Sequence, residues 1–116
     1  GMIEIMEKYG DPIIIDPNTE ISNLSIVSAN GPLSLLSKII DNANVDINQQ
    51  DKDGNTPLIF AIVNRKPEHV TLLLDRGAEP NLANFGGGTP LAYAIASNQT
   101  EIEKMLLEKN RIFHFL

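Results

Sequence analysis

The sequence GNTPL at residues 54–58 returns as GGTPL at residues 87–91. The same separation of 33 residues (87 − 54 = 33), which we call the repeat offset, relates Ala61 to Ala94 and Leu73 to Leu106. A fixed period of this length indicates stacked supersecondary units, none of which can bury its apolar face alone. Such stacks work by presenting a surface to a partner, so the repeat directs the functional question toward binding rather than catalysis.

Residues 51–83 form the clearest unit of the repeat. Its first residues, DKDGN, have the composition of a tight turn, Thr56 is suited to cap a helix and Pro57 to begin one. We expect helices at about 57–64 and 67–76, the second ending at Gly77 in the left-handed conformation. Apolar residues at helical spacing form the expected buried faces: Leu58, Ala61, Ile62, Val70, Leu73 and Leu74.

Two further units flank this one. Residues 84–110 repeat the pattern closely, and residues 17–50 repeat it in a degenerate form. We expect helices at about 24–30 and 33–41 in the first unit and at 90–97 and 100–109 in the third. Asn110 stands where Gly77 stands and is predicted to end the last helix. The expected inward residues of these units are Val27, Leu35, Leu36, Ile39, Ile40, Leu91, Ala94, Ile95, Ile102, Leu106 and Leu107.

The two ends of the chain fall outside the repeat. Residues 1–20 are predicted to form a capping segment over the first unit, with a recognition strand or dimer contact as the alternative. Residues 111–116 form an apolar tail whose Phe113 and Phe115 we expect to fold back on the open end of the third unit. The alternative for the tail is a docking or self-association patch, because contiguous exposed apolar surface usually has a partner.

Composition excludes several classes of function. The 116 residues include 9 basic and 15 acidic side chains, a net charge of −6, and the scattered basic residues argue against a nucleic-acid partner. No apolar run is long enough to span a membrane. The chain has no cysteine, which excludes disulfides, thiolate catalysis and cysteine-ligated zinc. Because the first residues are acidic rather than basic, we expect a cytoplasmic protein, with export as a microbial effector as an open alternative.

No group of residues points to catalysis. His69 and His114 are the two histidines, and we expect His69 to be a solvated surface residue. The glycines at 86–88 before a helix superficially suggest an anion site, yet the lysine and strand of a phosphate loop are missing. We interpret them as a flexible or closely approached turn tip. The sequence therefore predicts no enzyme, no cofactor and no metal site.

Residues 51–81 resemble an ankyrin repeat. That family combines a turn D-x-x-G-x-T-P-L, an alanine on the first helix, a leucine pair on the second and a closing G-A-D-x-N, here GAEPN at residues 77–81. The resemblance covers about residues 21–110 and implies an all-α ankyrin-repeat solenoid with three repeats, 17–50, 51–83 and 84–110. The family's histidine after Pro-Leu is replaced by Ile59 and Ala92, and its glycine between the helices by Arg65 and Asn98. We expect both departures to weaken the coupling between units.

The resemblance also implies where a partner binds. In the family, partners lie against the concave side, which is made of turn tips and the outward face of the first helices. Phe85 is the expected anchor, because aromatic residues dominate binding hot spots; packing against the neighbouring turn is the alternative. The positions that carry over are Lys52, Asp53, Asn55, Val63, Asn64, Phe85, Gly86, Gly88, Ala96 and Ser97.

The function implied is that of an adaptor or inhibitor-like module that binds another protein. The alternative is a structural subunit or homo-oligomer that pairs through its apolar ends. We expect a monomer. The alternative is weak dimerisation through the C-terminal tail.

Overall fold

The structure is a computed structural model that describes residues 23–42 and 44–115, with side chains described up to residue 110. Within these residues it has helices and no strand, which confirms the predicted all-α class. The helices are α2 (Asn23–Asn30), α3 (Leu33–Ile40), α4 (Pro57–Val63), α5 (Pro67–Asp75), α6 (Pro90–Ala96) and α7 (Thr100–Phe115).

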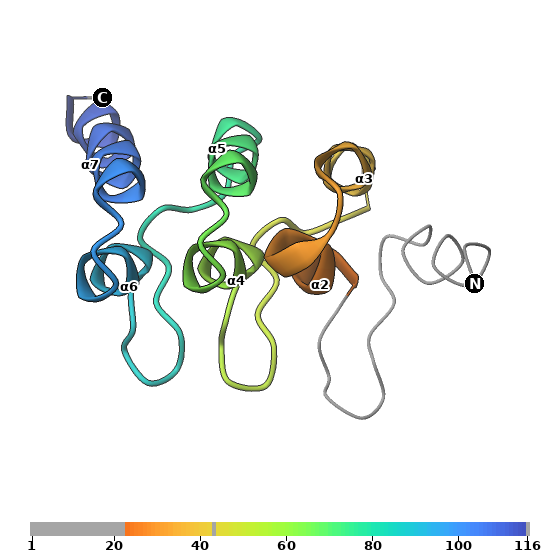
Figure 1. The fold of residues 1–116 in the computed structure, drawn as a ribbon, viewed down its shortest axis with the longest axis horizontal. Helices are drawn as coiled ribbons and strands as arrows, with labels where there is room; N and C mark the ends of the chain where they lie inside the picture. The colour runs from red at the N-terminus through yellow and green to blue at the C-terminus, as the bar shows by residue number, and fades with distance from the viewer. Residues whose placement is uncertain (1–22, 43, 116) are drawn as a thin grey trace.

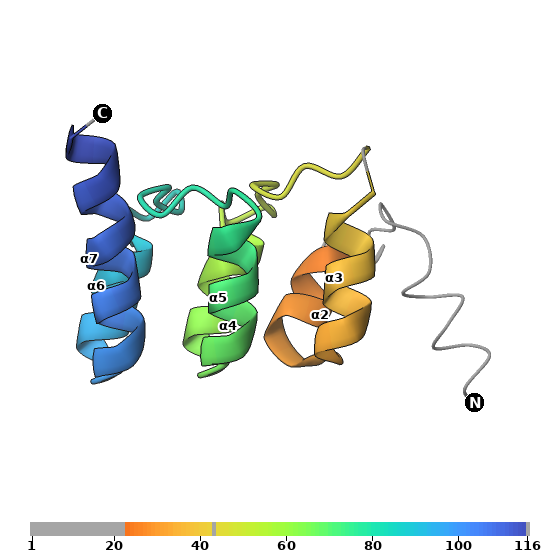
Figure 2. The ribbon, with the colours of Figure 1, turned by 90° about the horizontal axis from the view of Figure 1, so that it is seen from above.

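The helices form three pairs that follow one another along a line (Figure 1). The inner helices α2, α4 and α6 form one row, and the outer helices α3, α5 and α7 form a second row above it (Figures 1 and 2). The loops that precede α4 and α6 extend away from the inner row on the side opposite the outer row (Figure 1). The molecule is therefore a short stack with the turns along one edge.

Each inner helix of the two clear units begins as the sequence predicts. Thr56 accepts a hydrogen bond from Ile59 N at 3.2 Å through its Oγ1, and Thr89 accepts one from Ala92 N at 3.1 Å. A proline follows each threonine at the first helical position, where its missing N–H leaves no bond unmade. The repeated Thr-Pro pair therefore sets the start of α4 and of α6.

A residue in the left-handed conformation joins the two helices of each clear unit. Arg65 and Asn98 both have a φ of 59° there. The chain closes each first helix with the same bonds, such as Lys66 N to Ala61 O at 3.0 Å and Gln99 N to Ala94 O at 2.9 Å. Glycine would adopt this conformation without steric cost, whereas other residues lose about 1 kcal/mol.

One apolar core runs through all three units. The expected inward residues of the central unit are all buried, and Val27, Leu36, Ile39, Ala94, Ile102 and Leu106 are buried in the flanking units. The core is formed by contacts between successive units as well as within each helix pair, since α2 packs on α4 and α4 on α6. Leu35, Ile40 and Leu91 are partly buried against it.

The expectation that Ile95 and Leu107 point inward is wrong. Ile95 is 52% exposed and Leu107 is 42% exposed. Their equivalents one unit earlier, Ile62 and Leu74, are 0% and 6% exposed because the third unit covers them. The helical pattern is the same in both units, so the difference comes from the neighbour and not from the helix.

Two other expectations are corrected. His69 is buried at 8% exposure rather than solvated, and its Nε2 lies 2.8 Å from the carbonyl oxygen of Gly31. That contact joins α5 to the turn between α2 and α3.

Helix α7 does not end at Asn110 but continues to Phe115. The side chains of the tail, including Phe113 and Phe115, lie outside the described residues, as does the segment 1–20.

Candidate protein-binding face

The ten expected binding residues form five pairs, and each pair consists of the equivalent positions in two successive units. The first three pairs lie on the turns before α4 and α6, and the other two lie at the ends of those helices. The structure therefore places equivalent positions of the two units on neighbouring turns and on the neighbouring helices α4 and α6. The pairs related by the repeat offset are Lys52 and Phe85, Asp53 and Gly86, Asn55 and Gly88, Val63 and Ala96, and Asn64 and Ser97.

The two turns share one hydrogen-bonding pattern. Asp51 Oδ1 accepts from the backbone N–H groups of Asp53 and Asn55, both at 2.9 Å. In the next unit Asn84 takes the place of Asp51, and its Oδ1 accepts from Gly88 N at 2.8 Å. Side chains that bond to their own turn in this way hold the turn in one conformation.

Neighbouring turns are also bonded to each other. Phe85 N donates to Asp53 O at 3.0 Å, and Asn84 Nδ2 donates to Asn55 Oδ1 at 2.9 Å. Gln50 Nε2 reaches Ala83 O at 3.3 Å. The lack of the family's histidine therefore does not leave the turns unconnected, because backbone and amide groups connect them instead.

Arg65 also makes a contact between the units, while the expectation that it weakens their coupling stays a prediction. Its guanidinium Nη2 donates to Ser97 O at 3.0 Å, across the interface between the second and third units. Gln99, on the same side of the stack, donates to Ile62 O at 2.7 Å. Hydrogen bonds between the second and third units thus hold this side of the stack in a defined shape.

Phe85 is exposed and also packs against the neighbouring turn, while its role as a binding anchor stays a prediction. It is 70% exposed at the turn tip. Part of its ring nevertheless packs over Gly54 of the neighbouring turn, where an added Cβ would lie 2.6 Å from Phe85 Cδ1 and 2.5 Å from Phe85 N. Gly54 also has a φ of 83°, so both space and backbone conformation favour glycine there.

Tyr93 supports the second turn, and the sequence analysis did not identify it. Its hydroxyl accepts a hydrogen bond from Asn84 Nδ2 at 2.7 Å. Its ring lies so close to Gly88 that an added Cβ would be 2.7 Å from Tyr93 Cε2. Phe60 holds the equivalent position one repeat earlier, so an aromatic at one position of both inner helices was the available signal.

The expected site residues differ in whether their polar groups are already hydrogen-bonded and in how exposed they are. Asn64 Nδ2 donates to Phe60 O at 2.8 Å and Ser97 Oγ donates to Tyr93 O at 2.6 Å, so both polar groups are engaged with their own helix. Asn55 and Gly88 are half-buried. The exposed members of the set are Lys52, Asp53, Val63, Asn64, Phe85, Gly86 and Ala96.

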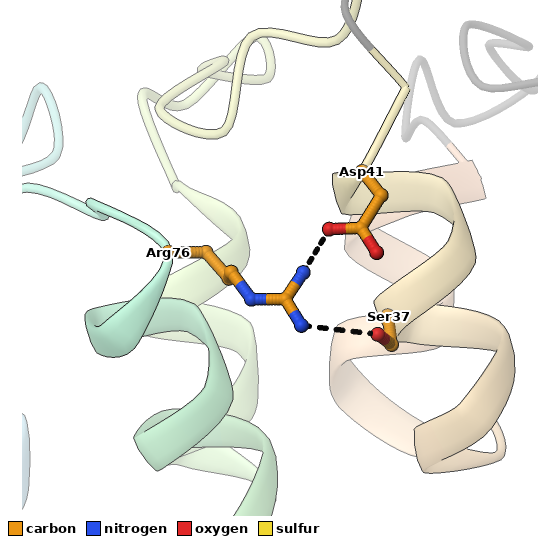
Figure 3. A network of polar contacts seen from close by, with 3 residues as sticks. All are labelled: Ser37, Asp41 and Arg76. Atoms are coloured by element: carbon orange, nitrogen blue, oxygen red, sulfur yellow. Dashed lines mark hydrogen bonds and ion pairs between the residues drawn. The ribbon is translucent and has the colours of Figure 1, made fainter.

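Charge is distributed unevenly between the two rows of helices. The inner helices α2, α4 and α6 contain no Asp, Glu, Lys or Arg. The ion pairs between described residues lie on the outer row: Arg76 with Asp41, and Lys109 with Asp75 at 3.6 Å. Figure 3 shows Arg76 reaching both Asp41 and Ser37, the latter at 3.4 Å. The inner side is therefore poor in charge, with Lys52 and Asp53 of opposite sign at one turn tip.

The described residues contain no cluster of His, Cys, Asp and Glu side chains that could hold a metal ion. Among them there is also no helix with the length and apolar character needed to cross a membrane.

Comparison with known proteins identifies a matching family model and a similar human protein. The family model of ankyrin repeats in three copies matches residues 24–114. The human protein named transient receptor potential cation channel subfamily A member 1 is 38% identical over 90 residues, which cover 77% of this chain. The match spans only 8% of that relative's length.

Proposed function

This chain belongs to the ankyrin repeat family, and on that premise we propose that it is a non-catalytic module that binds another protein. It acts as an adaptor or inhibitor-like binder through the turn tips and inner helices. One copy of the chain is sufficient for binding at this face. A cytoplasmic location is part of the proposal, since a chain without cysteine suits a reducing compartment.

One observation carries the proposal: exposed apolar side chains lie on a side of the stack that is poor in charge. Phe85 is 70% exposed and Val63 is 56% exposed. The helices α4 and α6 carry no charged residue, and the charged residues nearest to α4 in sequence are Lys52 and Asp53 on the turn before it and Arg65 and Lys66 after it. The centres of protein interfaces are depleted in charged residues and enriched in aromatic ones. The preformed turns reduce the ordering cost of binding, because their conformation is already fixed by hydrogen bonds.

A displayed library of protein domains tests the proposal. Binders selected on the whole chain should lose affinity for Phe85→Ala by about tenfold or more, the loss typical of a hot-spot aromatic. Ala96→Arg, which adds bulk to an exposed position of α6, should block the same binders without removing any buried contact.

The matched control is Lys38→Ala on the outer helix α3, which should leave binding unchanged. Thermal unfolding of each variant checks that the fold persists. Selected binders that tolerate both inner-side variants but fail on Lys38→Ala would place the partner on the other side of the stack and refute the proposal.

A further inference from the structure

The outer helices meet their neighbours through one repeated set of contacts. Asp41, just after α3, pairs with Arg76, and Asp75, at the end of α5, pairs with Lys109. Asp41 and Asp75 occupy equivalent positions, and Arg76 and Lys109 are related by the repeat offset. The first and second units therefore each present an acidic residue to a basic residue of the following unit.

Two further contacts mark the same interface between the second and third units. Thr71 Oγ1 of α5 lies 3.0 Å from the sulfur of Met105 on α7. Leu74 is covered by the third unit and is 6% exposed. The residues of α5 that face the next unit are thus Thr71, Leu74 and Asp75, which share one side of that helix.

Helix α7 presents the same three positions with nothing described against them. Lys104, Leu107 and Glu108 stand one repeat offset after Thr71, Leu74 and Asp75. Together with the 52%-exposed Ile95 of α6, they form what we call the end face. Lys104 and Glu108 are both exposed, and neither forms an ion pair with any residue that the structure describes.

We propose that the end face binds the end face of a second copy of this chain, related by a two-fold axis. Lys104 and Glu108 are four residues apart and lie on the same side of α7 around Leu107. If two α7 helices pack antiparallel, Lys104 lies opposite Glu108 of the partner subunit, and the symmetry repeats this pair. The end face is therefore complementary to itself, as a two-fold interface must be.

Charge complementarity favours this arrangement over a second copy stacked in line. In an in-line stack, Glu108 would meet the residue of the first unit that corresponds to Arg76 and Lys109. That residue is Asn42, because the loop after α3 is one residue longer than the loop after α5. At this position an in-line copy thus offers Glu108 an amide rather than a cation, whereas the two-fold copy offers Lys104 of the partner subunit. The proposal goes beyond the binding of another protein and leaves the inner side of both copies free.

Charge swaps on the full chain test the proposal, with analytical ultracentrifugation from micromolar to millimolar concentration as the measurement. The natural chain should reach a dimer and stop there. Lys104→Glu sets two acids against each other at both symmetric contacts, and Glu108→Lys does the same with two cations. Each variant alone should weaken dimerisation by about tenfold, since two exposed attractions become two repulsions.

An equimolar mixture of Lys104→Glu and Glu108→Lys should regain the natural affinity, because each variant supplies the charge that the other needs. Lys38→Glu on α3 is the matched control and should leave the dimer unchanged, and circular dichroism confirms that all variants are folded. A chain that stays monomeric at every concentration overturns the proposal. So does growth beyond the dimer, which indicates in-line stacking, and so does a mixture of variants that fails to regain affinity.

Discussion

The second and third units of this stack have nearly the same sequence pattern but different surroundings. Both begin with a threonine-capped helix and both place an isoleucine and a leucine at the same positions. In the second unit Ile62 and Leu74 are buried, whereas in the third Ile95 and Leu107 are exposed. The comparison teaches that the repeated motif determines local structure, while burial depends on what packs against each unit.

The largest expected effect comes from Leu73, a core residue of the second unit whose equivalent Leu106 is also buried, and it is set against exposed Leu107 of the third unit. Leu73→Ala removes a side chain that is 0% exposed and should lower the free energy of unfolding by about 2–5 kcal/mol. Leu107→Ala, on the open side of the third unit, should cost about 1 kcal/mol or less at concentrations too low for self-association. Chemical denaturation measures both. Because each unit depends on its neighbour, Leu73→Ala should still unfold in one transition, and separate transitions would show that the units are not coupled.

The two turn tips provide a smaller test of the same comparison. Gly54 and Gly87 are equivalent and have φ values of 83° and 87°, but only Gly54 lies under Phe85. Gly54→Ala should therefore cost about 1–3 kcal/mol, since it adds a steric clash to the backbone strain. Gly87→Ala should cost about 1 kcal/mol, from the strain alone. Equal losses from the two substitutions would mean that the Phe85 contact places no constraint on the turn.

The smallest expected effect concerns the acidic residues of the outer helices. Asp75→Asn removes the partner of Lys109 and should lower the free energy of unfolding by about 0.2–1 kcal/mol, less at high salt. Glu108→Gln, at the equivalent position of the third unit, should leave the stability of the monomer unchanged. Thermal unfolding at low and high salt separates the two, and a matching loss from Glu108→Gln would show that this carboxylate has a partner within its own chain.

The repeat and its caps could be predicted from the sequence because they depend on short stretches of chain. Thr56 and Thr89 each cap a helix by accepting a hydrogen bond from the backbone N–H three residues later. The ankyrin resemblance rested on these same residues and is confirmed by the family match over residues 24–114. The buried residues of the central unit could likewise be predicted, because they recur at helical spacing.

What sequence reasoning missed depends on neighbours in space. His69 was expected to be solvated, although the buried Ile102 holds the equivalent position one repeat later and would have predicted an interior position. Asn110 was aligned with Gly77, but Gly77 is followed within three residues by Pro80, while no proline follows Asn110. Without that proline an asparagine costs a helix less than about 1 kcal/mol, so α7 continues.

The candidate site was predicted only as far as positions in the repeat allow. The repeat offset identified which residues share the inner side, and the resemblance supplied its role. The sequence could not show that Asn64 and Ser97 direct their polar groups to their own helices. Nor could it show the bonds between the turns, because these join residues of different units, in part through backbone atoms that carry no sequence signal.

The interface between the second and third units has mechanical consequences for the stack. It carries polar contacts at three separate heights: Phe85 N to Asp53 O at the turns, Gln99 to Ile62 O between the inner and outer rows, and Lys109 to Asp75 on the outer row. Contacts spaced in this way oppose bending in either direction, since any tilt of one unit must lengthen at least one of them. A pulling force along the stack is then shared among the three levels, so we expect this interface to resist bending more than one with contacts at a single level.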